Sequence, residues 1–218
     1  MRFRMLKDRH VGETCWIVGT GPSLDAIDPD TITGPRIYLN RAAFVLPAER
    51  YMTYWLVADD AWGQKIEGPW NEHLHRVISG DAATILLARD PLLVPGGAHA
   101  KPQDGPHIAH WKSSHTPRQA LRCMTRDELA DSGELYSHCG TAAPAIHAAW
   151  LMGCTRVILA GIDGTDGHAK CLQQYYTAKP TRGGLGYMTS RGDAIETAEA
   201  LRLEIDDRSN IPTEPLPR

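Results

Sequence analysis

The chain carries, near its start, the stretch Cys15-Trp16-Ile17-Val18-Gly19-Thr20-Gly21-Pro22-Ser23-Leu24. Its first residues form a short apolar run, which is typical of a buried strand. Glycines lack Cβ, so the turn after the strand can bring backbone N–H groups close to a ligand. Ser23 can cap a following helix, whose N-terminus favours an anion. This order predicts a phosphate or nucleotide site; the alternative is a strand that simply ends in a turn.

The turn differs from the dinucleotide-binding fingerprint in two respects. Leu24 stands where the third glycine of that fingerprint belongs. No acidic residue occurs about 20 residues further on, where the chain reads Tyr38-Leu39-Asn40-Arg41. NAD is therefore a disfavoured ligand.

Composition narrows the class of protein. The 218 residues suit one sizeable domain, and 42% apolar with 22% charged residues is ordinary for a globular protein. The net charge of −3 gives no general attraction to nucleic acid. The five cysteines are widely spaced and form no C-x-x-C pair, which argues against a zinc ribbon or a disulfide framework. We expect a cytoplasmic protein without a membrane span, because no leader-like or spanning apolar run occurs.

Apolar runs and helical periodicity predict an α/β fold. The runs are rich in β-branched and aromatic residues, and helical or loop segments separate them, which favours a Rossmann-like, mainly parallel sheet with helices on both faces. A helix over 141–153 ends at Gly153, and a second over 193–205 would begin at Asp193 with Glu196 completing a capping box. The predicted strands are 14–19, 36–39, 53–58, 84–88 and 156–161.

The middle of the chain does not fit this pattern. Proline and glycine are frequent from 91 to 118, so we predict that the single domain, 1–218, carries a lid-like insertion at about 91–135. Histidines in this stretch match no common metal-ligand spacing, and we expect structural or surface roles for them.

A second group of polar residues surrounds the predicted helix at 141–153. Gly140 and Thr141 precede the helix, where free amides attract an anion. Asp163 follows the next strand, at the edge where open α/β sheets bind ligands. Alternatives remain open: Thr141 as a plain helix cap, and Asp163 as an Asx-turn residue.

These two groups carry a resemblance. The run from Gly19 to Leu24 resembles the opening of the bacterial sialyltransferase family typified by Campylobacter lipooligosaccharide enzymes, and Asn40 falls where that family has an asparagine. The stretch from Gly140 to Asp163 is similar to the family's second signature. A wider set shares both signatures: flagellin-modifying glycosyltransferase-like proteins, phage-borne relatives and an archaeal-type 6-hydroxymethylpterin pyrophosphokinase.

The resemblance implies a nucleotide site and a place for the leaving phosphate. Tyr175 and Tyr176 resemble a tyrosine pair that holds this phosphate, and hydroxyl donors there would stabilise developing negative charge. Arg182 and Arg191 suit phosphate through bidentate bonding. The nucleotide-binding residues would be Gly19, Gly21, Pro22, Ser23, Asn40, Gly140, Thr141 and Asp163.

One departure concerns the general base. The sialyltransferases have a late histidine before their last helix, whereas the chain contains no histidine after His168. Sialyl transfer itself is therefore doubtful, and Asp193 or His168 would have to accept the proton of the acceptor.

Asp59 and Asp60 follow a predicted strand and could bind Mg²⁺ between them and a phosphate. The pyrophosphokinase relatives need such a metal and the sialyltransferases do not. A solvated turn or a helix cap is the alternative for this pair.

The sequence thus predicts a glycosyltransferase-like enzyme that uses a nucleotide-sugar donor. The acceptor, a glycan, a protein or a modified DNA base, stays open, and the resemblance makes a homo-oligomer possible. The alternatives are a Mg²⁺-dependent pyrophosphokinase and a non-catalytic, phage-associated nucleotide-binding protein.

Overall fold

A computed structural model describes most of the chain and shows one parallel β-sheet. The described residues are 3–44, 53–57, 84–89, 108–114, 118–137, 140–164, 169–175 and 185–210. Within them, eight strands pair in the order β6-β5-β4-β3-β2-β1-β7-β8, every pair parallel. The strands are β1 (Thr14–Val18), β2 (Arg36–Leu39), β3 (Thr53–Val57), β4 (Thr84–Arg89), β5 (Ile108–Ser114), β6 (Glu134–Tyr136), β7 (Arg156–Ala160) and β8 (Glu204–Asp207).

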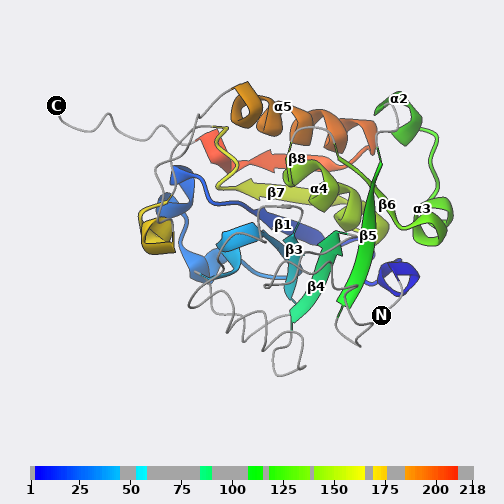
Figure 1. The fold of residues 1–218 in the computed structure, drawn as a ribbon, viewed down its shortest axis with the longest axis horizontal. Helices are drawn as coiled ribbons and strands as arrows, with labels where there is room; N and C mark the ends of the chain where they lie inside the picture. Colours follow the sequence, from blue (N-terminus) through cyan, green and yellow to red (C-terminus); the bar gives the residue numbers. More distant parts are fainter. Residues whose placement is uncertain are drawn as a thin grey trace, which may run out of the picture.

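The five predicted strands are confirmed to within one residue of their ends, as β1, β2, β3, β4 and β7. The side chains of β1, β2, β3 and β7 are buried almost throughout, because both faces of the sheet are covered. The sheet twists, so that β5 runs steeply across β1 in the view of Figure 1.

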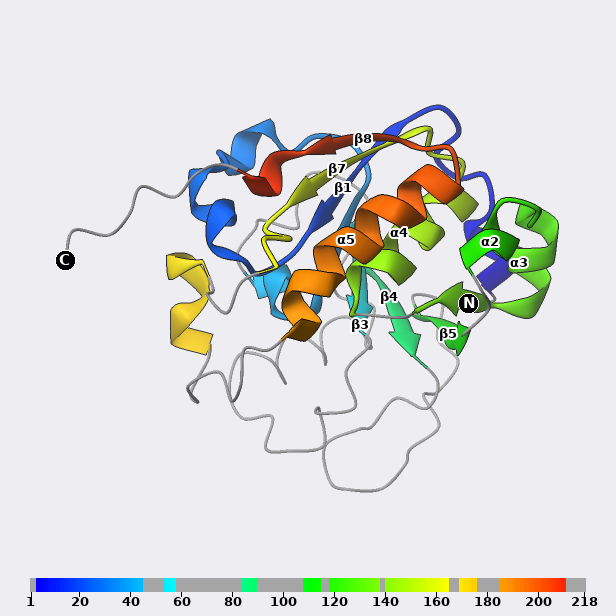
Figure 2. The ribbon, with the colours of Figure 1, turned by 90° about the horizontal axis from the view of Figure 1, so that it is seen from above.

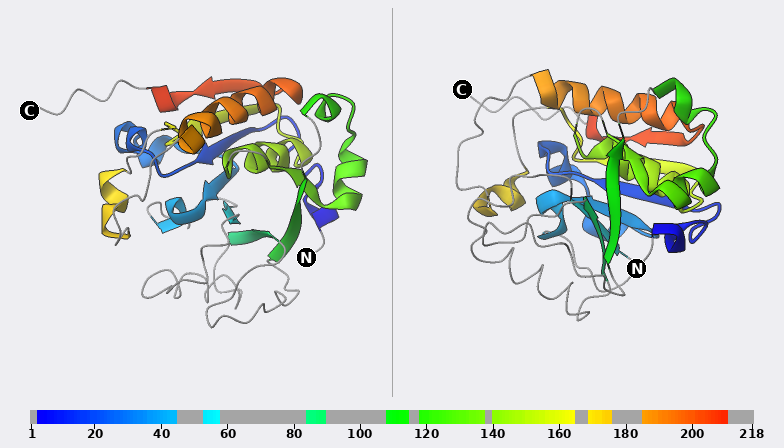
Figure 3. Two further views of the ribbon diagram at one scale, coloured as in Figure 1. Left: turned by 45° about the horizontal axis from the view of Figure 1, so that its top comes forward. Right: turned by 45° about the vertical axis from the view of Figure 1, so that its right-hand side comes forward.

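The two faces of the sheet are covered differently. Longer helices pack on one face: α3 (Arg126–Ser132), α4 (Ala142–Leu151) and α5 (Leu185–Ala200), the last two side by side in Figure 2. The other face is covered by short 3-10 helices, which Figure 3 shows gathered on the side to which the strand arrows point. They are η2 (Pro22–Ala26), η3 (Pro29–Thr31), η4 (Asn40–Phe44) and η6 (Lys170–Tyr175). The predicted α/β fold with helices on both faces is confirmed.

The helix α4 confirms the prediction for 141–153, and its chain reverses at Gly153. This residue has φ +91°, and an added Cβ would lie 3.0 Å from the Cα of Val11. Only glycine meets both requirements without strain.

The predicted helix over 193–205 is wrong at both ends. The helix α5 starts at Leu185, so Asp193 lies in its interior and not at an N-cap. It ends at Ala200, after which Arg202 has a left-handed φ of +59°. Glu204 then donates its N–H to the carbonyl of Thr155, 3.0 Å away, and starts β8 beside β7. Tertiary strand pairing therefore overrides the local helical periodicity.

The middle of the chain contributes more to the sheet than its composition indicates. The strand β5 lies between β4 and β6, and its Trp111 is fully buried. The helices α2 (Arg118–Leu121) and α3 follow it. Residues 91–107 and 115–117 of the predicted lid-like stretch lie outside the described residues.

The order of the strands creates a switch point between β1 and β7. From β1 to β6 the chain adds each strand on the same side, and α4 then returns it to place β7 on the other side of β1. Open α/β sheets bind ligands outside the carboxyl ends of the strands at such a point. Among the described residues, no helix combines the length and apolar character needed to cross a membrane.

Candidate functional site

Two turns meet at the switch point, the turn 19–23 after β1 and the turn 161–163 after β7; we call them the switch-point site. Gly19 donates its N–H to the carbonyl of Ala160 at 2.8 Å, which continues the ladder beyond the strands. Gly21 donates its N–H to the carbonyl of Gly161, also at 2.8 Å. The two turns are thus one hydrogen-bonded unit, although 140 residues separate Ser23 from Asp163.

Close approach explains the glycines of this unit. A Cβ on Gly19 would overlap the carbonyl oxygen of Gly161, and a Cβ on Gly21 would overlap the carboxylate of Asp163. Gly21 has an ordinary φ of −71°, so it is required for space and not for conformation. Gly161 has φ +67° and in addition lies against the backbone of Gly19. The glycines serve the contact between the two turns.

Ser23 joins the two turns through both its backbone and its side chain. Its fully buried Oγ accepts the N–H of Gly161 at 3.2 Å, and its own N–H donates to Oδ2 of Asp163 at 3.2 Å. Gly21 is the N-cap of η2 and Pro22 follows it, so the prediction that Ser23 caps this helix is wrong. The amide expected to cradle a phosphate is occupied by a carboxylate of the chain itself.

Asp163 is the titratable centre of the site. It is half-buried, and burial raises its pKa above the ordinary value, while hydrogen bonds from Ser23 and the charge of Arg191 oppose that rise. The Ser23 N–H donates to Oδ2 of this carboxylate, and the Ser23 side chain and the backbone of Asp163 itself also hydrogen-bond to it. A carboxylate with further acceptor positions suits a ligand that presents hydroxyl or amino groups.

Asn40 lies at the carboxyl end of β2, next to β1. Its φ is +49°, and its carbonyl accepts the indole N–H of Trp55 at 2.7 Å, which holds this left-handed conformation. Its side-chain Oδ1 is buried and has no hydrogen-bond partner among the described residues. A strained residue with an unsatisfied acceptor is a typical feature of a functional site.

Gly140 and Thr141 precede α4 at the same edge of the sheet. Thr141 takes the N-cap position but makes no side-chain cap hydrogen bond, so the plain capping alternative is wrong. No acidic side chain occupies the first turn of α4. Gly140 has φ +113°, and a Cβ there would lie 2.6 Å from Oγ of Ser190 on α5.

Of the predicted catalytic residues, the structure describes the side chain of Asp193 alone. Asp193 is 4% exposed, on α5, and accepts the hydroxyl of Tyr136 at 3.2 Å. Tyr175 ends η6, and its side chain lies outside the described residues. The other predicted catalytic and metal-binding residues lie outside the described residues too: His168, Tyr176, Arg182, Asp59 and Asp60.

Two residues of β8 and its continuation were missed from the sequence. Ser209, in η7 (Arg208–Asn210), accepts the N–H of Ile162 with its Oγ at 2.8 Å. Asp207 accepts the N–H of Ser209 at 3.0 Å. No local signal marks them, because the predicted helix over 193–205 ends inside β8 and no strand is predicted there.

The described part of the chain shows neither a group of side chains that could hold a metal ion nor a disulfide. No group of three or more histidine, cysteine or acidic side chains is placed there to hold a metal ion. The described cysteines, Cys15, Cys123, Cys154 and Cys171, are all free.

No protein-family model matches the chain, and no curated protein sequence matches it significantly. The resemblance to the sialyltransferases therefore stays a prediction. The function has to be argued from the switch-point site alone.

Proposed function

We propose that the switch-point site binds the nucleotide of a nucleotide-sugar donor, and that the protein transfers the sugar to a hydroxyl group of an acceptor. One observation carries the proposal: the half-buried Asp163 lies at the carboxyl ends of the two switch-point strands and is fixed by Ser23 of the glycine turn. Ligands bind at this place in open α/β sheets. A desolvated carboxylate held there is a typical recognition group.

The arrangement suggests which part of the donor each residue meets. Because Asp163 fills the amide of the glycine turn, this turn suits the ribose, whose hydroxyls can donate to the carboxylate. The unsatisfied Oδ1 of Asn40 can accept a hydrogen bond from the base or the ribose. The uncapped start of α4 at Thr141 favours the phosphates.

In the transfer, the acceptor oxygen would form a bond to the anomeric carbon while the bond from that carbon to the phosphate oxygen breaks. The proton of the acceptor would pass to a base, for which His168 and Asp193 are the candidates. The leaving phosphate keeps the electron pair, and Tyr175, Tyr176 and Arg182 would donate hydrogen bonds to it.

Calorimetry with CMP, UDP, GDP and ATP, each with and without Mg²⁺, tests this proposal. We expect CMP or UDP to bind without the metal. Asp163→Ala and Ser23→Ala should weaken that binding at least about tenfold, the size of one lost charge-assisted hydrogen bond. Asp127→Ala, at an exposed carboxylate on α3, is the control and should leave binding unchanged.

Two outcomes contradict the proposal. If none of the four nucleotides binds, the site is not a nucleotide site. If only ATP binds, and only with Mg²⁺, the protein belongs with the pyrophosphokinase alternative and the sugar-donor proposal is wrong.

A further inference from the structure

Arg191 lies on α5 beside the switch-point site and is held by β8. Its Nε and Nη2 donate to the same oxygen, Oδ2 of Asp207, at 2.9 and 2.6 Å. A guanidinium has five N–H groups, so three remain without a described partner. The side chain as a whole is 26% exposed, so it is not closed off from a ligand.

Asp207 connects Arg191 to the backbone of the site. Its second oxygen, Oδ1, accepts the N–H of Ser209, whose Oγ accepts the N–H of Ile162. Ile162 immediately precedes Asp163 in the turn. A chain of hydrogen bonds thus fixes the guanidinium relative to the turn that carries the recognition carboxylate. The charge of Arg191 acts on Asp163, where it opposes the rise in pKa that burial causes.

Ser190, which precedes Arg191 in α5, lies next to the start of α4. Ser190 lies directly against Gly140, the residue before the N-cap of α4. Arg191 therefore lies near this helix start, while its charge also acts on Asp163. A negatively charged group of a ligand would meet a fixed cation there as well as the first-turn amides.

We propose that Arg191 binds the phosphate of the nucleotide in the switch-point site, and that Asp207 is its positioning residue. The inference rests on the proposed function, since it names the residue that recognises the charged part of the donor. The two residues would recognise different parts of the ligand: Asp163 binds a part that carries hydroxyl groups, and Arg191 binds the anionic part.

The division has a measurable consequence. The wild-type protein should bind a nucleotide more tightly than the matching nucleoside, and Arg191 should account for the difference. Lysine keeps the charge but not the planar fork that fits a phosphate and Asp207 together. Arg191→Lys should therefore retain part of the preference, and Arg191→Gln should lose it.

The experiment compares three ligands by calorimetry: the nucleotide of the above panel that binds most tightly, its nucleoside, and inorganic pyrophosphate. For Arg191→Gln we expect nucleotide affinity to fall about tenfold or more and nucleoside affinity to stay unchanged. Arg156→Gln is the matched control. Arg156 pairs with Glu204 and Asp206 on the same strand, β8, and should affect none of the three ligands.

The remaining outcomes separate this inference from the proposed function. Equal losses for nucleotide and nucleoside, or no loss for either, overturn the role of Arg191. If Arg191→Gln does not fold, Arg191→Lys decides by the same comparison. If no nucleotide binds but pyrophosphate binds in an Arg191-dependent way, the proposed function fails while the anion site stands. If nothing binds to the wild-type protein, both are overturned.

Discussion

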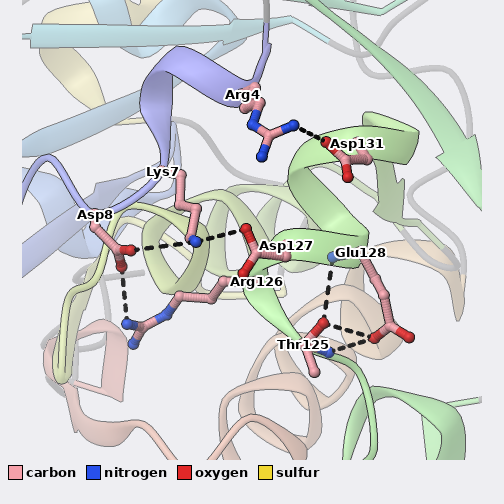
Figure 4. A network of polar contacts seen from close by, with 8 residues as sticks. All are labelled: Arg4, Lys7, Asp8, Thr125, Arg126, Asp127, Glu128 and Asp131. Carbon is pink, nitrogen blue, oxygen red and sulfur yellow. Dashed lines mark hydrogen bonds and ion pairs between the residues drawn. The ribbon is translucent and has the colours of Figure 1, made fainter.

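Polar groups are arranged differently at the amino and carboxyl edges of the sheet. At the amino edge, the N-terminal helix η1 (Phe3–Leu6) and the turn after it lie against α3 (Figure 4). Arg4 pairs with Asp131 at 2.8 Å and Lys7 with Asp127 at 2.6 Å. In these two pairs each charge has an opposite charge beside it, and the side chains of the first pair are 64% and 59% exposed.

At the carboxyl edge, polar groups are buried and less completely paired. Asp163 is half-buried and hydrogen-bonded by Ser23 at the turn, while the cation Arg191 acts on it through its charge. Asn40 keeps a strained backbone and an unsatisfied buried oxygen. Exposed ion pairs add about 0–1 kcal/mol each and leave nothing for a ligand. The features of the carboxyl edge cost stability, which is expected where a fold retains them for binding.

The largest expected effect is a loss of stability in acid, caused by a histidine buried between the two edges. His147 on α4 is fully buried, and its Nδ1 accepts the N–H of Tyr136 at 3.0 Å. Burial lowers its pKa from 6.5 to about 3. A histidine with a lowered folded pKa stabilises the fold above its unfolded pKa, and this contribution is lost as the pH falls from there toward the folded value.

At pH 4 the free energy of unfolding should therefore have fallen by about 3 kcal/mol through His147, at about 1.4 kcal/mol for each pH unit below its unfolded pKa. Urea unfolding between pH 7 and 4 measures the slope. His147→Gln offers Tyr136 an acceptor that does not titrate, so its slope should be flatter. The exposed carboxylates of Asp127 and Glu128 have pKa values lowered from 3.8 and 4.5, so their contributions begin to fall only near the acid end of this range. Equal slopes for the wild type and the variant would show that the acid response comes from elsewhere.

The glycines of the two edges provide the next test. In Gly21→Ala the methyl group meets the carboxylate of Asp163, so we expect a loss of about 1–3 kcal/mol in stability and a loss of nucleotide binding. Gly12, at the amino edge, has φ +78° and open space around it. Gly12→Ala should cost only the left-handed conformation, roughly 1–2 kcal/mol, and leave binding intact.

Denaturant unfolding and calorimetry on both variants separate stability from binding. The contrast between the edges fails if Gly12→Ala weakens nucleotide binding as much as Gly21→Ala does.

The sequence was informative where local pattern and final position agree. The continuous apolar runs of β1 and β7 identify buried strands, and Gly19, Gly21 and Asp163 follow them directly. They were therefore correctly expected at one edge of the sheet. The role of the glycine turn was not: its amide receives Asp163, a partner 140 residues away that no local pattern reveals.

The C-terminal region shows the opposite case. Leu201 and Ile205 follow Ala198 at helical spacing, although Leu203 between them breaks that period, and β8 forms because β7 leaves an open edge for it. Asp207 and Ser209 became part of the site only through this pairing. Similarly, β5 lies in a proline-rich neighbourhood, and burial of Trp111 in the sheet decides its structure. Both β5 and β8 are determined by pairing with strands distant in the sequence, which a single sequence does not reveal.

The smallest expected effect concerns one carboxylate at each edge. The folded pKa of Asp163 is raised, so its charge destabilises the fold at neutral pH, and this penalty disappears as the pH falls toward its unfolded pKa. The pKa of Asp127 is lowered, first by its hydrogen bond with Lys7, so its charge stabilises the fold above the unfolded pKa, and this is lost in acid.

The two asparagine variants should consequently shift stability in opposite directions. Asp163→Asn keeps an acceptor for the Ser23 N–H, and we expect the free energy of unfolding at pH 7 to stay equal or rise by less than about 1 kcal/mol, because solvent screens a half-buried group. Nucleotide affinity should fall. Asp127→Asn should lower stability slightly and leave affinity unchanged. If Asp163→Asn destabilises the protein while binding persists, Asp163 is a structural residue of the turn, and the carboxyl edge differs from the amino edge only in its burial.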